Sequence, residues 1–253
     1  MKQVYFVGAG PGDPDLITIK GAKCVEMADV IIYAGSLVNP EVLKVNKKNA
    51  TIYNSATMSL EEVLTVIKEA SQKGQTIARV HTGDPSIYGA IQEQMDALEE
   101  MDILYEVIPG VSSFTAAAAS IKREFTLPGV TQTVICTRLA GRTAVPDKEK
   151  LEDLAKHRAS MAIFLSVGMI EEVAEQLMTH YPVDTPVAVV KKASWIDEEI
   201  VLTTLDKVAE IVKRQGIHKT AQILVGDFIS TDYEKSKLYD KAFSHEYRKG
   251  TCV

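Results

Sequence analysis

The sequence predicts an α/β fold made of two α/β domains, and three observations support this. Short apolar segments that suit buried strands alternate with helix-like segments along the 253 residues. Loops rich in glycine and proline follow several of the expected strands, where open α/β sheets place their ligands. The pattern weakens near 122–130, and Pro128-Gly129 is the best candidate for a linker. We therefore expect domains at 1–121 and 122–230, followed by a polar tail at 231–253.

The first half begins with an apolar run at 4–7 that ends in glycines and resumes as a helical pattern over 18–28. Ser59 and Glu62 have the spacing of a capping box, and Lys73-Gly74 marks the end of that helix. Asp84 as a cap followed by Pro85 predicts a helix over 87–101. The other elements expected in this half are strands at 30–33, 51–53, 76–80 and 104–108 and a helix over 114–120.

A second set of alternating strands and helices is expected in the second half, and no internal repeat is visible. Strands are expected at 131–137, 161–166, 186–190, 200–204 and 221–225. Helices are expected over 148–157, 169–179 and 205–214. From about 231 the chain is charged with scattered aromatic residues, which is typical of a tail and not of a core element.

The opening glycine loop is unsuited to a dinucleotide. In the G-x-G-x-x-G fingerprint that begins at Gly8 and Gly10, the third glycine is replaced by Asp13, a carboxylate where pyrophosphate would lie. Pro11 and Pro14 also remove amide donors from the loop. A nicotinamide oxidoreductase is therefore the disfavoured enzyme alternative, and no clear ribose-binding acid follows the second expected strand.

Composition limits the remaining function classes. With 46% hydrophobic and 25% charged residues, the chain has the composition of a soluble globular protein. It shows no signal-peptide pattern and no apolar stretch of about 18 residues, so we expect a cytoplasmic protein without a membrane span. A net charge of −6 disfavours nucleic acid as a partner. Cys24, Cys136 and Cys252 lack C-x-x-C spacing, which argues against disulfides and a structural zinc site, and we expect no metal.

Four loops that follow strands could carry chemistry. They are the opening glycine loop, Thr82-Gly83-Asp84-Pro85 with Ile87, the segment 109–113, and the segment 138–142. Each also has a structural interpretation, because Gly-Asp-Pro often caps a helix, Pro-Gly is a common turn, and arginines are often solvated. No G-x-S-x-G motif occurs, so nothing indicates a serine nucleophile.

Taken together and in order, these motifs resemble the tetrapyrrole (uroporphyrinogen and corrin) methylase family. The matching segments are 7–18, 83–85, 109–113 and 185–189, and the resemblance covers about 2–226. Further matches at 80–90, 131–135, 137–143 and 236–243 are most similar to the branch that methylates C11 of precorrin-4 or cobalt-precorrin-4 in cobalamin biosynthesis. A related methylase acting at another ring carbon is the nearest alternative.

The resemblance implies transfer of a methyl group from S-adenosyl-L-methionine to a carbon of a corrin precursor, with S-adenosyl-L-homocysteine as the product. It implies a cofactor folded between the two domains in an active-site cleft, and a homodimer. The cofactor contacts that it carries over to this sequence are Pro11, Thr82, Gly83, Asp84, Ile87, Ser112, Ser113, Leu165 and Ala193.

Side-chain chemistry would add little to such a transfer, since the sulfonium is already an activated donor. Arg138 and Arg142 are expected to bind the carboxylates of the tetrapyrrole. His81 and Tyr88 are the candidates for a general base that removes a proton from the ring. The sequence also leaves open a diphthamide methylase of similar fold, which modifies a protein, and a non-catalytic corrinoid-binding protein.

Overall fold

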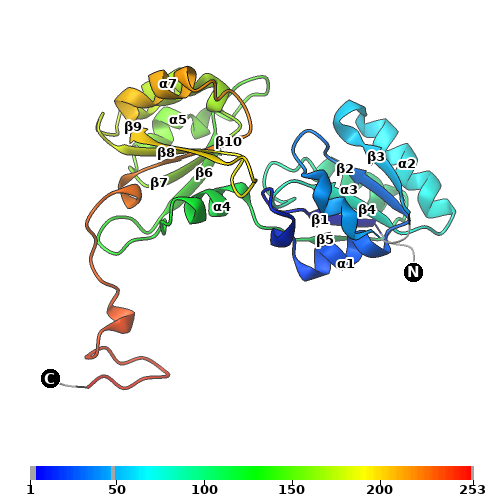
Figure 1. Cartoon of the computed structure of the whole chain (residues 1–253), viewed down its shortest axis with the longest axis horizontal. Coiled ribbons are helices and arrows are strands. Elements are labelled where there is room, and N and C mark those ends of the chain that lie inside the picture. Colours follow the sequence, from blue (N-terminus) through cyan, green and yellow to red (C-terminus); the bar gives the residue numbers. More distant parts are fainter. Residues whose placement is uncertain (1–3, 47–48, 252–253) are drawn as a thin grey trace. The chain divides into compact units, whose positions relative to one another are not determined.

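The computed structural model describes residues 4–46 and 49–251, and these form two compact units (Figure 1). The first unit extends to Ser120 and also includes Lys191–Glu199, a segment distant in sequence. The second unit comprises Ile121–Val190 and the chain from Ile200 onwards. The domain predicted from the sequence at 122–230 includes the segment Lys191–Glu199. An active-site cleft between the domains stays a prediction.

The first unit is built on a parallel five-stranded sheet in the order β3-β2-β4-β1-β5. Its strands are β1 (Val4–Gly8), β2 (Val30–Tyr33), β3 (Thr51–Asn54), β4 (Ile77–His81) and β5 (Tyr105–Ile108). Because all five run in the same direction, their carboxyl ends meet at one edge, and β4, β1 and β5 are neighbours in the sheet. The loops after these three strands therefore lie next to one another.

Helices bury both faces of this sheet. The helices of the first unit are α1 (Ile19–Met27), α2 (Leu60–Gln72), α3 (Gln92–Glu100) and α4 (Ser113–Ser120). Phe6 of β1 shares a core with Ile67 of α2 and Leu98 of α3, whereas Val7 shares the opposite core with Val25 of α1. Successive side chains of a strand point to opposite faces, so near-continuous apolar strands such as β2 serve both cores.

The second unit has a mixed five-stranded sheet in the order β6-β7-β10-β8-β9. Its strands are β6 (Val134–Arg138), β7 (Ser160–Phe164), β8 (Pro186–Lys191), β9 (Glu199–Thr204) and β10 (Ala221–Val225). β6 runs parallel to β7, and β10 runs antiparallel to it. The helices α5 (Leu151–Ala155), α6 (Ile170–Met178) and α7 (Leu205–Arg214) pack on one apolar core, which Met161, Leu177 and Val212 help to form.

Local signals placed most of the elements correctly. In the capping box of α2, Ser59 Oγ accepts from Glu62 N at 3.3 Å, while Glu62 Oε2 accepts from Ser59 N at 2.7 Å. Asp13 caps a 3-10 helix at Pro14–Leu16 by accepting from Asp15 N at 2.9 Å. Some expectations were too long: the strand at 131–137 begins at Val134, the strand at 161–166 ends at Phe164, and the helix over 148–157 is reduced to α5.

The helix predicted over 87–101 is wrong at its start. α3 begins at Gln92, and Tyr88 and Ala90 have φ values of 55° and 49° in the left-handed region, which no right-handed helix tolerates. Asp84 therefore caps no helix, and its carboxylate instead accepts from Ser86 N at 2.8 Å and Gly110 N at 2.9 Å. The intervening segment 85–90, named here the 85–90 loop, is folded by these contacts.

Three further features concern the cysteines, membrane spans and the polar tail. Cys24 is buried and Cys136 exposed, and both are free thiols, while Cys252 lies outside the described residues. Over 4–46 and 49–251, no helix is long and apolar enough to cross a membrane. In the polar tail, Arg248 Nη2 donates to the carbonyl groups of Leu238 and Asp240.

Candidate functional site

Three glycines bring the loops after β1, β4 and β5 into backbone contact. A Cβ atom on Gly110 would lie 2.1 Å from Gly83 O and 2.8 Å from Gly8 Cα. Gly83 N also donates to Gly10 O at 2.8 Å, and Gly10 N donates to Gly83 O at 3.3 Å. No residue with a side chain would fit such close backbone approaches at positions 8 and 110. We call Gly8, Gly83 and Gly110 the glycine junction.

Gly83 differs from the other two glycines because a Cβ atom there would meet its neighbours at ordinary van der Waals distances. Its φ is +61°, and the nearest atoms to a Cβ there would be Ser112 Cα at 3.6 Å and Ser113 N at 3.7 Å. The backbone of this glycine therefore lies against the start of α4. A ligand could approach the main chain closely at this point.

A distant segment holds the opening loop. Trp195 Nε1 donates to Pro11 O at 2.8 Å, and Asp13 N donates to Ser194 Oγ at 3.0 Å. The indole also occupies the space beside Gly12, where a Cβ atom would lie 2.0 Å from Trp195 Cδ1. Ala193, the residue before Ser194, is buried. These contacts bring the predicted cofactor positions Pro11 and Ala193 into one region of the first unit.

Gly12→Ala should therefore displace the indole and destabilise the first unit by about 1–3 kcal/mol, the usual range for overpacking. In a Trp195→Ala background the same change should cost less than about 0.5 kcal/mol, because the obstructing ring is gone. Urea unfolding of the four variants measures this coupling. Equal costs of Gly12→Ala in both backgrounds would refute the contact.

The first unit contains eight of the nine predicted cofactor positions. Pro11, Gly83, Ser112 and Ala193 are buried, whereas Thr82, Asp84, Ile87 and Ser113 are partly exposed. Leu165 belongs to the second unit, follows β7 and is 67% exposed with a φ of 55°. Tyr88 and Ser194 also have left-handed φ values. Such values cost energy in residues other than glycine and are frequent at functional sites. The cofactor role of all nine positions stays a prediction.

The two candidate bases differ in exposure. His81 is 4% exposed at the end of β4, and its Nε2 has no hydrogen-bond partner in the described structure. Burial, and then the charge of Arg79, lower the pKa of His81 to about 3, so the imidazole is neutral near pH 7 and weakly basic. Tyr88 is 45% exposed in the 85–90 loop.

The two predicted substrate arginines have different surroundings in the second unit. Arg138 ends β6, and its guanidinium donates to the carbonyl groups of Thr143 at 3.0 Å and Ala144 at 2.6 Å. Leu139 N donates to Ser166 Oγ at 2.9 Å, which ties the same loop to the end of β7. Arg142 lies exposed in that loop. Arg138 therefore shapes the loop, and Arg142 is the arginine available to a ligand.

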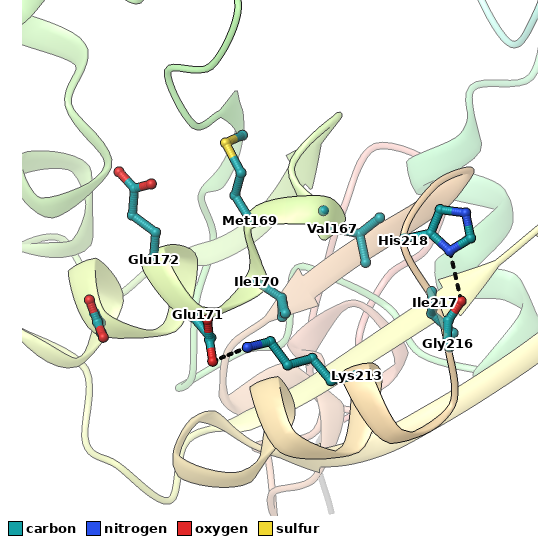
Figure 2. A pocket seen from close by; sticks show the side chains of 11 residues that line it. Val167, Met169, Ile170, Glu171, Glu172, Lys213, Gly216, Ile217 and His218 are labelled. Atoms are coloured by element: carbon teal, nitrogen blue, oxygen red, sulfur yellow. Dashed lines mark hydrogen bonds and ion pairs between the residues drawn. The ribbon is translucent and has the colours of Figure 1, made fainter.

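A cavity of about 670 Å³ lies in the second unit beside α6 and α7 (Figure 2). Figure 2 shows Lys213 pairing with Glu171 on its wall, and His218 Nδ1 lies 2.9 Å from Gly216 O. None of the predicted cofactor positions lines it. Met169 on its wall is also near the arginine loop, since a Cβ on Gly141 would lie 3.2 Å from the Met169 methyl group.

The sequence interpretation missed several residues of this site. Trp195 and Ser194 were not singled out, although Trp195 is the one tryptophan in the chain and lies between two expected strands. Their contacts with the opening loop span 184 and 181 positions of sequence. Packing over such distances leaves no local pattern.

Comparison with known proteins gives a consistent result. The family model of the tetrapyrrole (corrin/porphyrin) methylases matches residues 3–209. A cobalt-precorrin-4 C(11)-methyltransferase from Methanocaldococcus jannaschii is 60% identical over 250 residues, which covers 98% of this chain and 96% of that protein.

Solved structures agree with these sequence matches. The X-ray structure of a cobalt precorrin-4 methyltransferase, a cobalamin biosynthetic enzyme, superposes with a TM-score of 0.88 at 46% identity, covering 90% of this chain and 96% of that one. A uroporphyrin-III C-methyltransferase from Thermus thermophilus, complexed with S-adenosyl homocysteine, has a TM-score of 0.75 at 25% identity, covering 92% and 96%.

Proposed function

The chain belongs to the tetrapyrrole (corrin/porphyrin) methylase family, and we propose that it transfers a methyl group from S-adenosylmethionine to C11 of cobalt-precorrin-4 in cobalamin biosynthesis. The similarity to the Methanocaldococcus jannaschii C11-methyltransferase supports this proposal most directly, because 60% identity extends over 98% of this chain. The cobalt precorrin-4 methyltransferase with a TM-score of 0.88 supports the same reaction.

The first unit offers a suitable surface for the cofactor. The observation that carries the assignment is that the main chain of Gly83 lies against the start of α4, with Ser112 Cα and Ser113 N at 3.6–3.7 Å from the missing Cβ. Pro11, Thr82, Asp84, Ile87 and Ala193 belong to the same unit. These residues would hold S-adenosylmethionine largely through main-chain groups, with Leu165 as a proposed contact from the second unit. A relative complexed with S-adenosyl homocysteine supports this cofactor class.

The bound cofactor would supply an activated methyl group on its sulfonium, which needs no nucleophilic side chain from the protein. The chain's part is to orient the two reactants and to exclude water. If a proton must leave the ring, Tyr88 is the better-placed group, since it is exposed whereas the pKa of His81 is lowered to about 3 by burial. His81 would then act as a neutral polar group.

Arg142 gives the first test of the substrate. Peripheral acetates and propionates make the tetrapyrrole a polyanion, and charge-assisted hydrogen bonds to carboxylates contribute about 1.5–3 kcal/mol. Arg142→Ala should therefore raise the KM for the tetrapyrrole about tenfold and leave the Kd for S-adenosylmethionine unchanged. Steady-state kinetics and calorimetry measure the two quantities.

Two further variants separate a specific contact from a general charge effect. Arg214→Ala removes an exposed arginine of α7 and should change neither constant. Arg138→Ala should lower the melting temperature of the protein, because the guanidinium that it removes donates hydrogen bonds to two carbonyl groups of the loop. An unchanged KM for Arg142→Ala would remove that residue from the proposed substrate site.

The reaction itself is tested by methyl transfer. The purified protein is incubated with methyl-labelled S-adenosylmethionine and, separately, cobalt-precorrin-4, metal-free precorrin-4, uroporphyrinogen III and the diphthamide acceptor protein. We expect label in cobalt-precorrin-4 and slower transfer to the metal-free compound. Faster labelling of uroporphyrinogen III would favour a methylase of another ring carbon, and binding without transfer would favour a corrinoid carrier.

The proposed function also includes the physical state of the enzyme. We propose a cytoplasmic homodimer that takes a small tetrapyrrole substrate and no nucleic acid. Sedimentation at micromolar concentration should give twice the chain mass of 27.7 kDa. A stable monomer with full activity would reject the dimer without affecting the chemistry.

A further inference from the structure

Arg79 of β4 is buried without a carboxylate. Its side chain is 7% exposed, and within the described structure its guanidinium donates to an amide oxygen, Gln94 Oε1 at 3.1 Å, and to Ile32 O at 3.3 Å. Burial lowers the pKa of Arg79 to about 10, which still leaves it charged near neutral pH. Burial of a charge costs free energy of folding, so we expect Arg79 to have a role that an apolar residue could not fill.

Gln94 of α3 connects this charge to the 85–90 loop. It is 5% exposed, and its Nε2 donates to Ala90 O at 2.8 Å. A guanidinium can only donate hydrogen bonds, so Arg79 fixes the amide with its oxygen towards β4 and its nitrogen towards the loop. The orientation of Gln94 therefore depends on the buried arginine.

The 85–90 loop needs such a tether. Tyr88 and Ala90 both adopt left-handed φ values, which are costly for residues other than glycine. The loop is also tightly folded between them, since a Cβ on Gly89 would lie 2.0 Å from Pro85 O. Surrounding contacts must hold this conformation, and the bond from Gln94 reaches the loop at one of the two strained residues.

We propose that Arg79 and Gln94 are positioning residues that hold the 85–90 loop in the shape that presents Ile87 to S-adenosylmethionine and Tyr88 to the substrate. The part that concerns these ligands rests on the proposed function. Neither residue needs to touch a ligand, because Arg79 acts through Gln94, and Gln94 acts through the carbonyl group of Ala90.

Gln94→Glu separates this role from general stability. The carboxylate still accepts from Arg79, now as an ion pair, so the protein should fold with a melting temperature within a few degrees of the unsubstituted chain. It has no donor for Ala90 O and would place two oxygens face to face, so the loop should be released. Gln92→Glu, on the exposed start of the same helix, introduces the same charge. It removes an exposed hydrogen bond to Asp96 and no contact with the 85–90 loop, so it serves as the control.

The readouts are amide hydrogen exchange at 86–91, calorimetric affinity for S-adenosylmethionine, and steady-state kinetics. In Gln94→Glu we expect faster exchange in this segment only, about a tenfold higher Kd and KM for the cofactor, and a smaller fall in kcat. Gln92→Glu should match the unsubstituted chain in all three.

Unchanged exchange at 86–91 in Gln94→Glu would overturn the tether. Faster exchange with unchanged affinity and kinetics would overturn its role at the site. If the unsubstituted chain failed to bind S-adenosylmethionine, the proposed function would fall, and with it the ligand part of this proposal. The exchange comparison would still test the tether.

Discussion

Gly83→Val is expected to reduce the affinity for S-adenosylmethionine by at least about 100-fold, or ~2.7 kcal/mol. The Cβ of the valine would already contact Ser112 Cα and Ser113 N, and its two methyl groups would cover the main chain that is proposed to bind the cofactor. A β-branched residue is also strained at a φ of +61°. Titration calorimetry of the folded variant measures the loss.

Gly216→Val is the matched control for backbone strain. Gly216 has a φ of +67° and no neighbour within 4 Å of a Cβ, and it belongs to the second unit. The free energy of unfolding of Gly216→Val should fall by about as much as that of Gly83→Val, by about 1–3 kcal/mol. Its affinity for S-adenosylmethionine should be unchanged. Equal loss of affinity in both variants, or none in Gly83→Val, would contradict the assignment of the cofactor site.

Gly110→Ala should have the largest effect on stability. Its Cβ would lie 2.1 Å from Gly83 O and 2.8 Å from Gly8 Cα, and both are main-chain atoms that cannot rotate away. We expect a loss of more than about 3 kcal/mol, beyond the usual overpacking cost, because β4, β1 and β5 would have to move apart. Urea unfolding followed by circular dichroism measures it.

Gly141→Ala provides the comparison for this substitution. Its Cβ would meet the flexible end of Met169 at 3.2 Å, so the neighbour can move aside. The cost should stay below about 1 kcal/mol. If Gly110→Ala were as mild as Gly141→Ala, the close approach in the glycine junction would be wrong.

The sequence could predict elements whose signals are local. The capping box at Ser59 and Glu62 forms both of its hydrogen bonds, and the helix and strand expected at 205–214 and 221–225 have the same limits in the structure. In each case, neighbouring residues supply the cap or the apolar pattern that decides the conformation.

The helix predicted over 87–101 was wrong at its start because a non-local interaction overrode a local one. Asp84 followed by Pro85 resembles a helix start, but the Asp84 carboxylate also accepts from Gly110 N, 26 positions away. Gln94 holds Ala90 from inside the core. These contacts favour the strained 85–90 loop over the first turns of a helix, and nothing in the local sequence reveals them.

The candidate site likewise combines positions that the sequence could predict with contacts that it could not. The resemblance selected positions that the structure gathers in the first unit, since eight of nine cofactor positions belong to it. It did not reveal that Trp195 and Ser194 hold the opening loop, nor that Arg138 is occupied by loop carbonyl groups. Those roles depend on which surfaces meet after folding.

The opening loop is held by contacts with other residues as well as by the conformations of its glycines. Asp13 caps the short helix at Pro14–Leu16 through its side chain, while its main-chain N–H binds Ser194. Pro11 is fixed through its carbonyl group by Trp195. The loop is therefore hydrogen-bonded to the segment Lys191–Glu199 of the same unit, which suits a surface that must position a cofactor.

The position of the transferred methyl group tests the central claim most directly. The protein is incubated with cobalt-precorrin-4 and S-adenosylmethionine carrying a ¹³C-labelled methyl group, and the product is examined by NMR. The proposed function predicts one labelled methyl group, bonded to C11. Label at another ring carbon, or no transfer to cobalt-precorrin-4 by a protein that binds the cofactor, would contradict it.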